Sequence, residues 1–149
     1  MLKSGAEHLK SLRDGRVVYV GGERVDDVTT HPAFRNGARS MAAIYDLKAS
    51  NPEFSFDEPA AGGKGKGASA NGKRERYSAY FLRAKTKEDL AKRTRLHRAI
   101  ADLSHGLLGR SPDHVSSFVT GMAMNPEVFK GFRENLVAYY EHMRREDVY

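Results

Sequence analysis

The stretch Gly109-Arg110-Ser111-Pro112-Asp113-His114 decides the fold of the second half of the chain, because it predicts where one helix ends and the next begins. Glycine commonly ends a helix. Serine commonly caps the start of a helix, and proline is tolerated in the first turn because the N–H that it lacks would have no partner within the helix there. Asn125-Pro126 repeats this arrangement. We therefore predict one helix over residues 112–123 and another over residues 126–145.

Three more helices are predicted upstream, each starting at a hydroxyl-bearing residue that can cap backbone N–H groups. Ser4 is followed three residues later by Glu7, which is the pattern of a capping box. Thr30 precedes Pro32, and Thr86 precedes two acidic residues that favour the first turn of a helix. The predicted helices cover residues 5–14, 30–48 and 86–107.

Turn chemistry predicts one short β-hairpin. Residues 17–20 are β-branched or aromatic, and Gly21-Gly22 can take the positive φ that a two-residue turn needs before residues 23–25. Residues 77–82 alternate aromatic and smaller side chains, so we expect a strand or an extended segment there. The predicted fold class is therefore mainly α with one small β-hairpin, in a single domain over residues 1–149.

A glycine- and lysine-rich stretch separates the two halves of the chain. Residues 60–73 consist almost entirely of Gly, Ala, Ser, Asn and Lys, a composition that cannot bury enough apolar surface to offset ordering. We therefore predict a flexible loop at about residues 57–76. Because Lys64 to Arg76 carries +4 of the formal net charge of +6, a small basic helical module that binds nucleic acid or another polyanion is an alternative function.

Several functional classes are disfavoured by what the sequence lacks. The absence of cysteine removes disulfides, thiolate nucleophiles and Cys-type metal sites, and it favours a reducing cytoplasm. No apolar run approaches the roughly 20 residues of a membrane helix. The histidines show no metal-ligand spacing such as H-E-x-x-H, so no metal is expected. The run from Gly67 nearly matches a phosphate-binding loop, but Arg74 replaces the hydroxyl that must bind magnesium.

Arg110 and His114 are the strongest candidates for a site, since they lie four residues apart at a helix start and can face one pocket. A guanidinium offers a fork of donors to a phenolate, a carboxylate or a phosphate, and an imidazole titrates near neutral pH. A lone arginine at a helix junction is more often an ordinary surface residue, so the surrounding motif has to decide. Ser111 is expected to cap the start of the helix, and the Asp113 carboxylate is expected to interact favourably with the positive end of the helix dipole.

Five runs of the sequence together resemble one known family. They are residues 11–16, 23–25, 27–36, 109–114 and 122–127. They are similar to the N-terminal part of the large oxygenase component in the 4-hydroxyphenylacetate 3-monooxygenase family of two-component flavin-dependent aromatic hydroxylases. The resemblance implies the helical N-terminal domain of an acyl-CoA-dehydrogenase-like fold, as a fragment of a longer enzyme.

The resemblance also assigns roles to the candidate residues. It implies that Arg110 and His114 are catalytic and contact a phenolic substrate, and that Ser111, Pro112 and Asp113 complete the substrate-binding run. His114 stands where the family typically has Tyr. This departure leaves the identity of the phenol open among 4-hydroxyphenylacetate, halophenols, nitrophenols and amino-acid-derived phenols.

The implied activity is a monooxygenase reaction of aromatic compound catabolism. Reduced FAD or FMN from a separate NAD(P)H-dependent reductase would react with O2, and a phenol would be hydroxylated ortho to its hydroxyl. The cofactor-binding segments are expected mainly beyond Tyr149, so the isolated chain is expected to be inactive. The resemblance implies a homotetramer in the full-length form. The composition and residue spacing lead us to expect a cytoplasmic protein with no metal, nucleic acid or membrane partner. A purely structural domain that docks through the aromatic stripe of the last helix is a third alternative.

Overall fold

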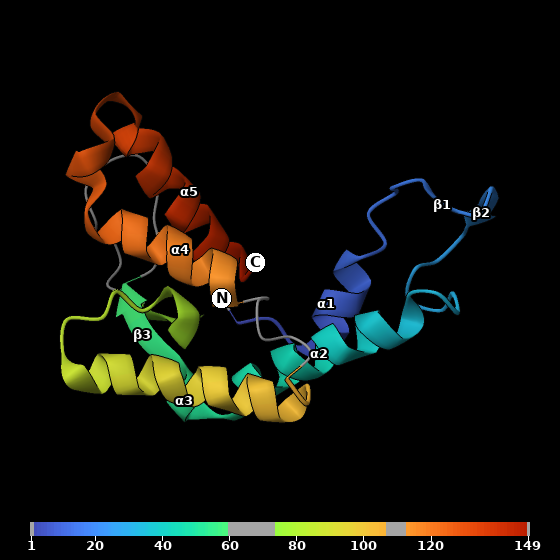
Figure 1. Ribbon diagram of the computed structural model, residues 1–149, viewed down its shortest axis with the longest axis horizontal. Helices are drawn as coiled ribbons and strands as arrows, with labels where there is room; N and C mark the ends of the chain where they lie inside the picture. The colour runs from blue at the N-terminus through green and yellow to red at the C-terminus, as the bar shows by residue number, and fades with distance from the viewer. Residues whose placement is uncertain (1, 60–73, 107–112, 149) are drawn as a thin grey trace.

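The computed structural model describes residues 2–59, 74–106 and 113–148, and these confirm a mainly helical fold with a small β-hairpin. The elements in chain order are α1 (Gly5–Ser11), β1 (Val18–Val20), β2 (Glu23–Val25), α2 (Arg35–Ser50), the short 3-10 helix η1 (Pro52–Phe54), β3 (Ser55–Pro59), β4 (Arg74–Ser78), η2 (Ala79–Phe81), α3 (Lys87–Leu103), α4 (Asp113–Met124), η3 (Pro126–Phe132) and α5 (Arg133–Glu146). Figure 1 shows that α1, the β1–β2 hairpin and the first part of α2 form an arm beside a body made by the other elements. Within the described ranges, no helix is both long enough and apolar enough to cross a membrane.

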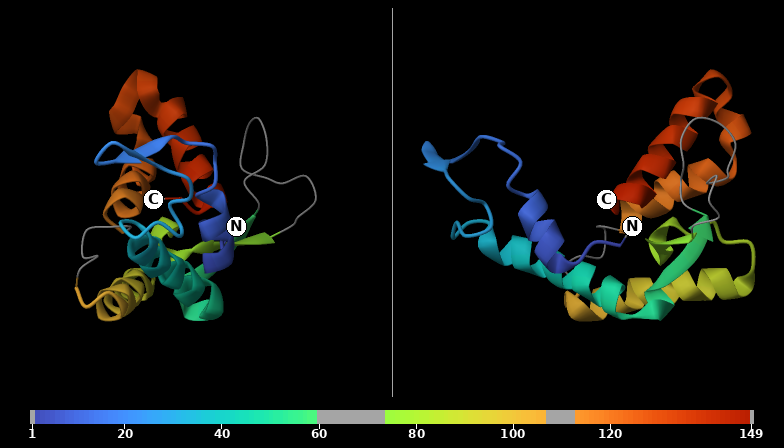
Figure 2. Two further views of the ribbon diagram at one scale, coloured as in Figure 1. Left: turned by 90° about the vertical axis from the view of Figure 1, so that its right-hand side faces the viewer. Right: turned by 180° about the vertical axis from the view of Figure 1, so that it is seen from behind.

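The arm begins with the predicted capping box. Ser4 Oγ accepts the Glu7 N–H at 3.2 Å, and the Glu7 carboxylate accepts the Ser4 N–H at 2.7 Å. α1 ends at Ser11, three residues before the predicted end. The hairpin that follows has the predicted turn, in which Gly21 and Gly22 take φ values of 57° and 88°. It projects at the far end of the arm (Figure 2).

The predicted helix start at Thr30 is wrong. The Asp27 side chain accepts the Thr29 N–H at 2.7 Å and the Asp27 carbonyl accepts the Thr30 N–H at 3.2 Å, so these residues close a turn instead. α2 begins at Arg35 and runs to Ser50, two residues beyond the predicted end. Its buried residues are Ala42, Ile44, Tyr45 and Lys48.

Both ends of the loop predicted at about residues 57–76 are strands instead. β3 and β4 form an antiparallel ladder in which Asp57 lies opposite Arg76. The opposite charges of this pair and the neighbouring rings of Phe56 and Tyr77, whose centroids are 5.9 Å apart, stabilise the pairing. The rest of the predicted loop, residues 60–73, lies outside the described residues.

The segment after β4 turns earlier than the predicted strand over residues 77–82. The Ser78 side chain accepts the Tyr80 N–H at 3.4 Å, and the chain curls into η2. α3 then begins at the predicted cap, because Thr86 and Asp89 bond each other's backbone N–H groups. It contributes Leu96 and Ile100 to a cluster of buried residues that also contains Ile44, Phe54, Ala79 and Tyr80.

α3 is shorter than predicted, since it ends at Leu103. Gly106 takes a φ of 77° and donates its N–H to the Ala101 carbonyl at 2.8 Å, which closes the last turn. Gly109, the predicted end of this helix, lies outside the described residues.

α4 matches its prediction closely, but the single helix predicted over residues 126–145 is wrong at its start. Residues 126–132 form η3, in which Lys130 has a φ of 44° and a ψ of −114°. This backbone conformation cannot continue a helix, so α5 begins only at Arg133. α4 and α5 then pack side by side in opposite directions (Figures 1 and 2).

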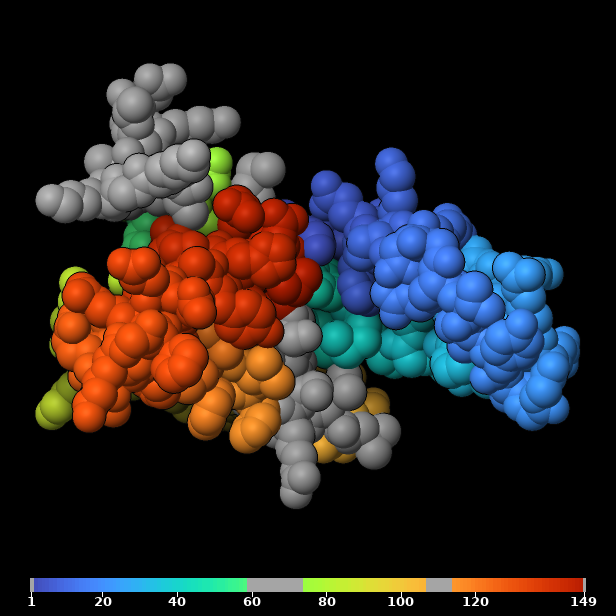
Figure 3. Space-filling model, turned by 90° about the horizontal axis from the view of Figure 1, so that it is seen from above, coloured from blue at the N-terminus to red at the C-terminus, as the bar shows by residue number. Residues whose placement is uncertain are grey.

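The α4–α5 pair is tied to η2 by two buried hydrogen bonds. The Tyr140 hydroxyl donates to the Phe81 carbonyl at 2.5 Å, and the Thr120 hydroxyl donates to the Tyr80 carbonyl at 3.2 Å. The second core cluster lies around these bonds and contains Phe81, Val119, Ala123, Tyr140 and Met143. Seen from above, the α4–α5 pair and the arm lie at opposite ends of the molecule (Figure 3).

Candidate functional site

The start of α4 is the part of the predicted site that can be located. Arg110, Ser111 and Pro112 lie outside the described residues, so the predicted closeness of Arg110 and His114 stays a prediction. Asp113 is the first residue of α4 and His114 is the second. Of the five predicted site residues, only His114 has a described side chain.

His114 forms an aromatic wall with Phe118, one helical turn later. The two ring centroids are 6.5 Å apart and the ring planes differ by 26°. Phe118 is 62% exposed, and Val115 beside them is also exposed. The buried residues of α4 are Ser116, Val119, Thr120 and Ala123. The aromatic wall therefore lies on the side of α4 that faces away from the core.

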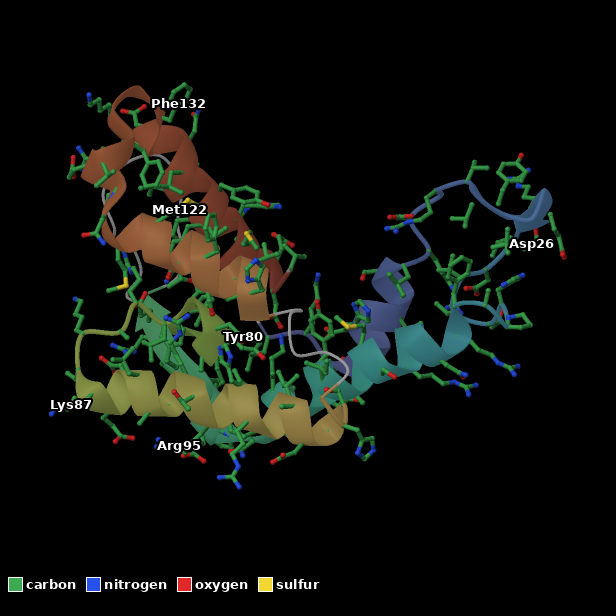
Figure 4. All side chains as sticks on the ribbon, viewed as in Figure 1. Asp26, Tyr80, Lys87, Arg95, Met122 and Phe132 are labelled. Carbon is green, nitrogen blue, oxygen red and sulfur yellow. The ribbon has the colours of Figure 1, made fainter. Side chains whose placement is uncertain are left out.

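Phe118 was not singled out by the sequence analysis, although its spacing of four residues from His114 could have indicated a shared helix face. The surface beyond the wall is open, because no described side chain or backbone outside α4 lies within 4 Å of a Cβ atom placed at Gly121. Met122, labelled in Figure 4, instead packs against the second core cluster. Within α4, the exposed aromatic side chains are thus those of the first two turns.

A buried ionic cluster, here called the Lys48–Asp147 cluster, joins α2, the N-terminal segment and the end of α5. Lys48 Nζ lies 2.9 Å from Asp147 Oδ1, and neither side chain is more than 1% exposed. The Lys3 N–H donates to the other oxygen of this carboxylate at 3.1 Å, and the Tyr45 hydroxyl donates to the Asp147 carbonyl at 2.9 Å. The sequence analysis missed the cluster because its two charges are 99 residues apart.

Burial controls the ionisation of this cluster. It lowers the pKa of Lys48 to about 8, against the opposing attraction of the Asp147 carboxylate. Burial also raises the pKa of the Tyr45 hydroxyl above its usual value, with the Asp147 charge acting in the same direction. The low polarity of the site therefore disfavours both the charged lysine and the charged tyrosine, and Asp147 is the group that keeps Lys48 protonated.

A cavity of about 240 Å³ lies in the arm, far from the aromatic wall. It is lined by Leu12, Arg13, Gly15, Arg16, Val25, Asp26, Asp27 and Val28. Arg13 Nε is 2.9 Å from the Asp27 carboxylate, and Arg16 pairs with Asp14. Because both guanidinium groups already have carboxylate partners, the cavity is poorly suited to an anionic ligand. Figure 4 shows its lining residue Asp26 at the opposite end of the molecule from Met122.

The aromatic wall can bind only one side of a ligand. An aromatic ring can stack on His114 and Phe118, and the imidazole can donate or accept a hydrogen bond. Both side chains are exposed, so a flavin would not be enclosed by the described residues, and these residues do not fit that cofactor by themselves. Within the described ranges, no group of three or more His, Asp or Glu side chains is arranged to hold a metal ion.

Comparison with known protein sequences gives matches over nearly the whole chain, of which a family model and one relative are described here. Residues 4–149 match the family model described as 4-hydroxyphenylacetate 3-hydroxylase N terminal. The chain is 39% identical over 147 residues to the oxygenase component of 4-nitrophenol 2-monooxygenase from Rhodococcus sp., covering 98% of this chain and 27% of that protein. The chain thus spans about a quarter of the length of this relative.

Solved structures also share the fold, among them the following two. The oxygenase component of 4-hydroxyphenylacetate 3-monooxygenase, crystallised with FAD and 4-hydroxyphenylacetate, is 35% identical with a TM-score of 0.78, covering 97% of this chain and 28% of that chain. A 4-hydroxybutyryl-CoA dehydratase from N. maritimus is 17% identical with a TM-score of 0.70, covering 99% of this chain and 28% of that chain. The second likeness concerns the fold alone. Together they confirm the predicted N-terminal helical domain of an acyl-CoA-dehydrogenase-like fold.

Proposed function

The chain belongs to the 4-hydroxyphenylacetate 3-hydroxylase N-terminal family, and from this premise we propose that it is the substrate-contacting N-terminal domain of a longer flavin-dependent monooxygenase. The complete enzyme hydroxylates a phenol with O2. One observation carries the proposal: the aromatic wall lies exposed at the start of α4, and its first residue, His114, ends the sequence run that contains Arg110. A flat aromatic substrate is the ligand that such a surface suits best.

The roles of the site residues follow from the chemistry of a phenol. With its ring on the aromatic wall and its oxygen toward the start of α4, the phenol would meet the guanidinium of Arg110. A cation there favours the phenolate, as does the positive end of the helix dipole. We propose that His114 exchanges the phenol proton. Ser111, Pro112 and Asp113 would shape the turn that presents Arg110.

The names of two relatives support a reaction next to the phenol hydroxyl. The 2-position of 4-nitrophenol and the 3-position of 4-hydroxyphenylacetate are both adjacent to the carbon that bears the hydroxyl. A phenolate is most electron-rich at its ortho and para carbons, and in both compounds the para carbon carries a substituent. We therefore infer ortho hydroxylation by the complete enzyme.

We propose that the flavin is held mainly by parts of the enzyme outside these 149 residues. The exposure of the aromatic wall supports this division, because a second surface is needed to close a site from water. Bound reduced FAD or FMN, supplied by a separate NAD(P)H-dependent reductase, provides the activated oxygen, while this chain binds and orients the phenol. We further propose that the complete enzyme is a cytoplasmic homotetramer.

The role of Arg110 is tested by Arg110→Ala in the complete enzyme, assayed with reduced flavin and a series of phenols. We expect kcat/KM to fall at least about tenfold, since a hydrogen bond to a charged group contributes about 1.5–3 kcal/mol. The matched control is Arg95→Ala, which removes an exposed arginine of α3 that pairs with Glu53 and Glu88. An unchanged kcat/KM for every accepted phenol would remove the role of Arg110.

The location of the flavin site is tested separately on the 149-residue chain. Titration with oxidised and reduced flavin is expected to show neither stoichiometric binding nor hydroxylation. Tight stoichiometric binding together with product formation would place the cofactor site within this chain.

The alternative of polyanion binding through Lys64 to Arg76 is not favoured by the family assignment. At the described end of this segment, Arg74 donates to the Asp57 carbonyl and Arg76 pairs with the Asp57 carboxylate. These two cations are therefore engaged with the chain itself.

A further inference from the structure

The Lys48–Asp147 cluster is the strongest feature that the proposed function leaves unexplained. Removing two charges from water costs a desolvation energy that their attraction often fails to offset, so a buried pair is weak evidence of added stability. A buried pair can instead specify one arrangement of the elements that carry it. The members of this cluster come from the segment before α1, from α2 and from the end of α5. The arrangement it fixes is therefore that of the arm and the α4–α5 pair.

Asp147 is held from several directions at once. Its backbone is left-handed, with a φ of 47° and a ψ of 50°, which a residue other than glycine adopts at a cost. Its carboxylate accepts from the Lys48 ammonium and the Lys3 N–H, and its carbonyl accepts from the Tyr45 hydroxyl. These bonds fix the direction in which the chain leaves α5.

The partners of Asp147 on α2 are in contact with α1, which belongs to the arm. Lys48 Nζ lies 4.3 Å from the centroid of the Tyr45 ring, and His8 of α1 stacks on the same ring at 4.5 Å. The first residue of α1 also bonds α2, since the Gly5 N–H donates to Asp46 at 2.7 Å. A tie to Asp147 is thus a tie to α1 and α2 together.

The same end of α5 lies beside the start of α4. The two helices are antiparallel, so the last turn of α5 adjoins the first turn of α4, which carries the aromatic wall (Figure 1). Val148, next to Asp147, packs against the core cluster that includes Val119 of α4. A displacement of Asp147 would therefore be transmitted to the helix that carries His114.

We propose that Tyr45, Lys48 and Asp147 are positioning residues, which fix the aromatic wall of α4 relative to the arm by tying the end of α5 to α2. None of them is assigned a contact with the substrate. The catalytic consequence rests on the proposed function, because it requires the aromatic wall to contact the phenol. The positional consequence does not depend on the proposed function.

The positional part is tested by spin labels at Arg39→Cys on α2 and Val115→Cys on α4, because both residues are exposed and the chain contains no other cysteine. Double electron–electron resonance on the 149-residue chain should give one narrow distance distribution. The double variant Lys48→Met/Asp147→Asn should broaden or shift it. This variant removes both charges of the pair together, and asparagine tolerates the left-handed backbone.

Two single variants keep the test decisive if the double variant does not fold. Tyr45→Phe removes only the hydroxyl that bonds the Asp147 carbonyl, and it should broaden the same distribution to a smaller extent. Arg95→Gln is the matched control, because it breaks exposed ion pairs on α3 and should leave the distribution unchanged. If the double variant does not fold, a wild-type distance distribution in Tyr45→Phe would overturn the positioning role. If the double variant unfolds cooperatively, a wild-type distribution in both variants would overturn it.

The catalytic part is tested with the same variants in the complete enzyme. The double variant should raise the KM for the phenol at least about tenfold with a smaller change in kcat, since a misplacement of about 1 Å can cost up to about a hundredfold. If the double variant has an altered distance distribution but the same KM as the wild-type enzyme, the link between positioning and the reaction would be overturned. A wild-type enzyme that hydroxylates no phenol would instead contradict the proposed function, and the spin-label distances would still decide the positioning role.

Discussion

Among single residues, Arg144 shows how this fold accommodates a buried charge. Its guanidinium lies 4.4 Å from the centroid of the Tyr77 ring, and it pairs with Glu141 at 2.6 Å and Glu58 at 2.5 Å. A guanidinium is tolerated in such a place because the carboxylates and the aromatic face replace water. Arg144 therefore holds the β3–β4 ladder against α5.

His8 gives a prediction about pH at the same scale. It stacks on Tyr45, and burial lowers its pKa, with further lowering by the charges of Lys3 and Lys48 and an opposing effect of Asp147. In the unfolded chain the pKa returns to about 6.5, so the unfolded state binds more protons as the pH falls below that value. The free energy of unfolding should therefore decrease between about pH 7 and pH 5.5.

The measurement is denaturant unfolding of wild type and His8→Phe across this pH range. Phenylalanine keeps the stacking on Tyr45 but cannot be protonated, so the variant should lose part of the pH dependence. Identical slopes for the two proteins would show that His8 does not contribute.

The residues of the site could be predicted from the sequence only where the signal is local. The start of a helix at His114 follows from its cap and proline, and the structure places His114 in the first turn of α4. Phe118 could have been found from its spacing, whereas the Lys48–Asp147 cluster could not, because its partners are 99 residues apart. Arg110 remains a prediction from the sequence.

At the scale of elements, the helices with side-chain caps were the most predictable. Ser4 and Thr86 start α1 and α3 through capping boxes that the sequence displays within four residues. The β3–β4 ladder was not predicted, because each strand is stabilised by a partner across a long polar insertion. Local composition carries no information about such a partner.

The break between η3 and α5 yields a second prediction. Lys130 has a φ of 44° and a ψ of −114°, a conformation that glycine adopts with little strain. Lys130→Gly should therefore stabilise the protein by about 0.5–1 kcal/mol in spite of the greater freedom of glycine in the unfolded chain. The comparison is Arg98→Gly, in the exposed interior of α3, which should destabilise it by about 1 kcal/mol. If Lys130→Gly and Arg98→Gly lower the free energy of unfolding by similar amounts, the backbone strain assigned to Lys130 would be contradicted.

For the whole molecule, the Lys48–Asp147 cluster joins α2 and the N-terminal segment to the end of α5, and the start of α4 lies beside the end of α5 (Figure 1). The wall is exposed and one-sided, as expected for a domain that supplies part of a larger site. The family resemblance predicted the architecture, and the matched structures confirm it. The sequence could not predict how the arm and body are joined, because the contacts that join them link residues far apart in the chain.

The proposed contact between the aromatic wall and a phenol is tested most directly by a crystal structure of the complete enzyme with a bound phenol such as 4-nitrophenol. We expect ring atoms of the phenol within about 4 Å of His114 or Phe118, the distance of direct contact between side chains. A phenol bound in the active site more than about 10 Å from both side chains, beyond any direct contact, would contradict it.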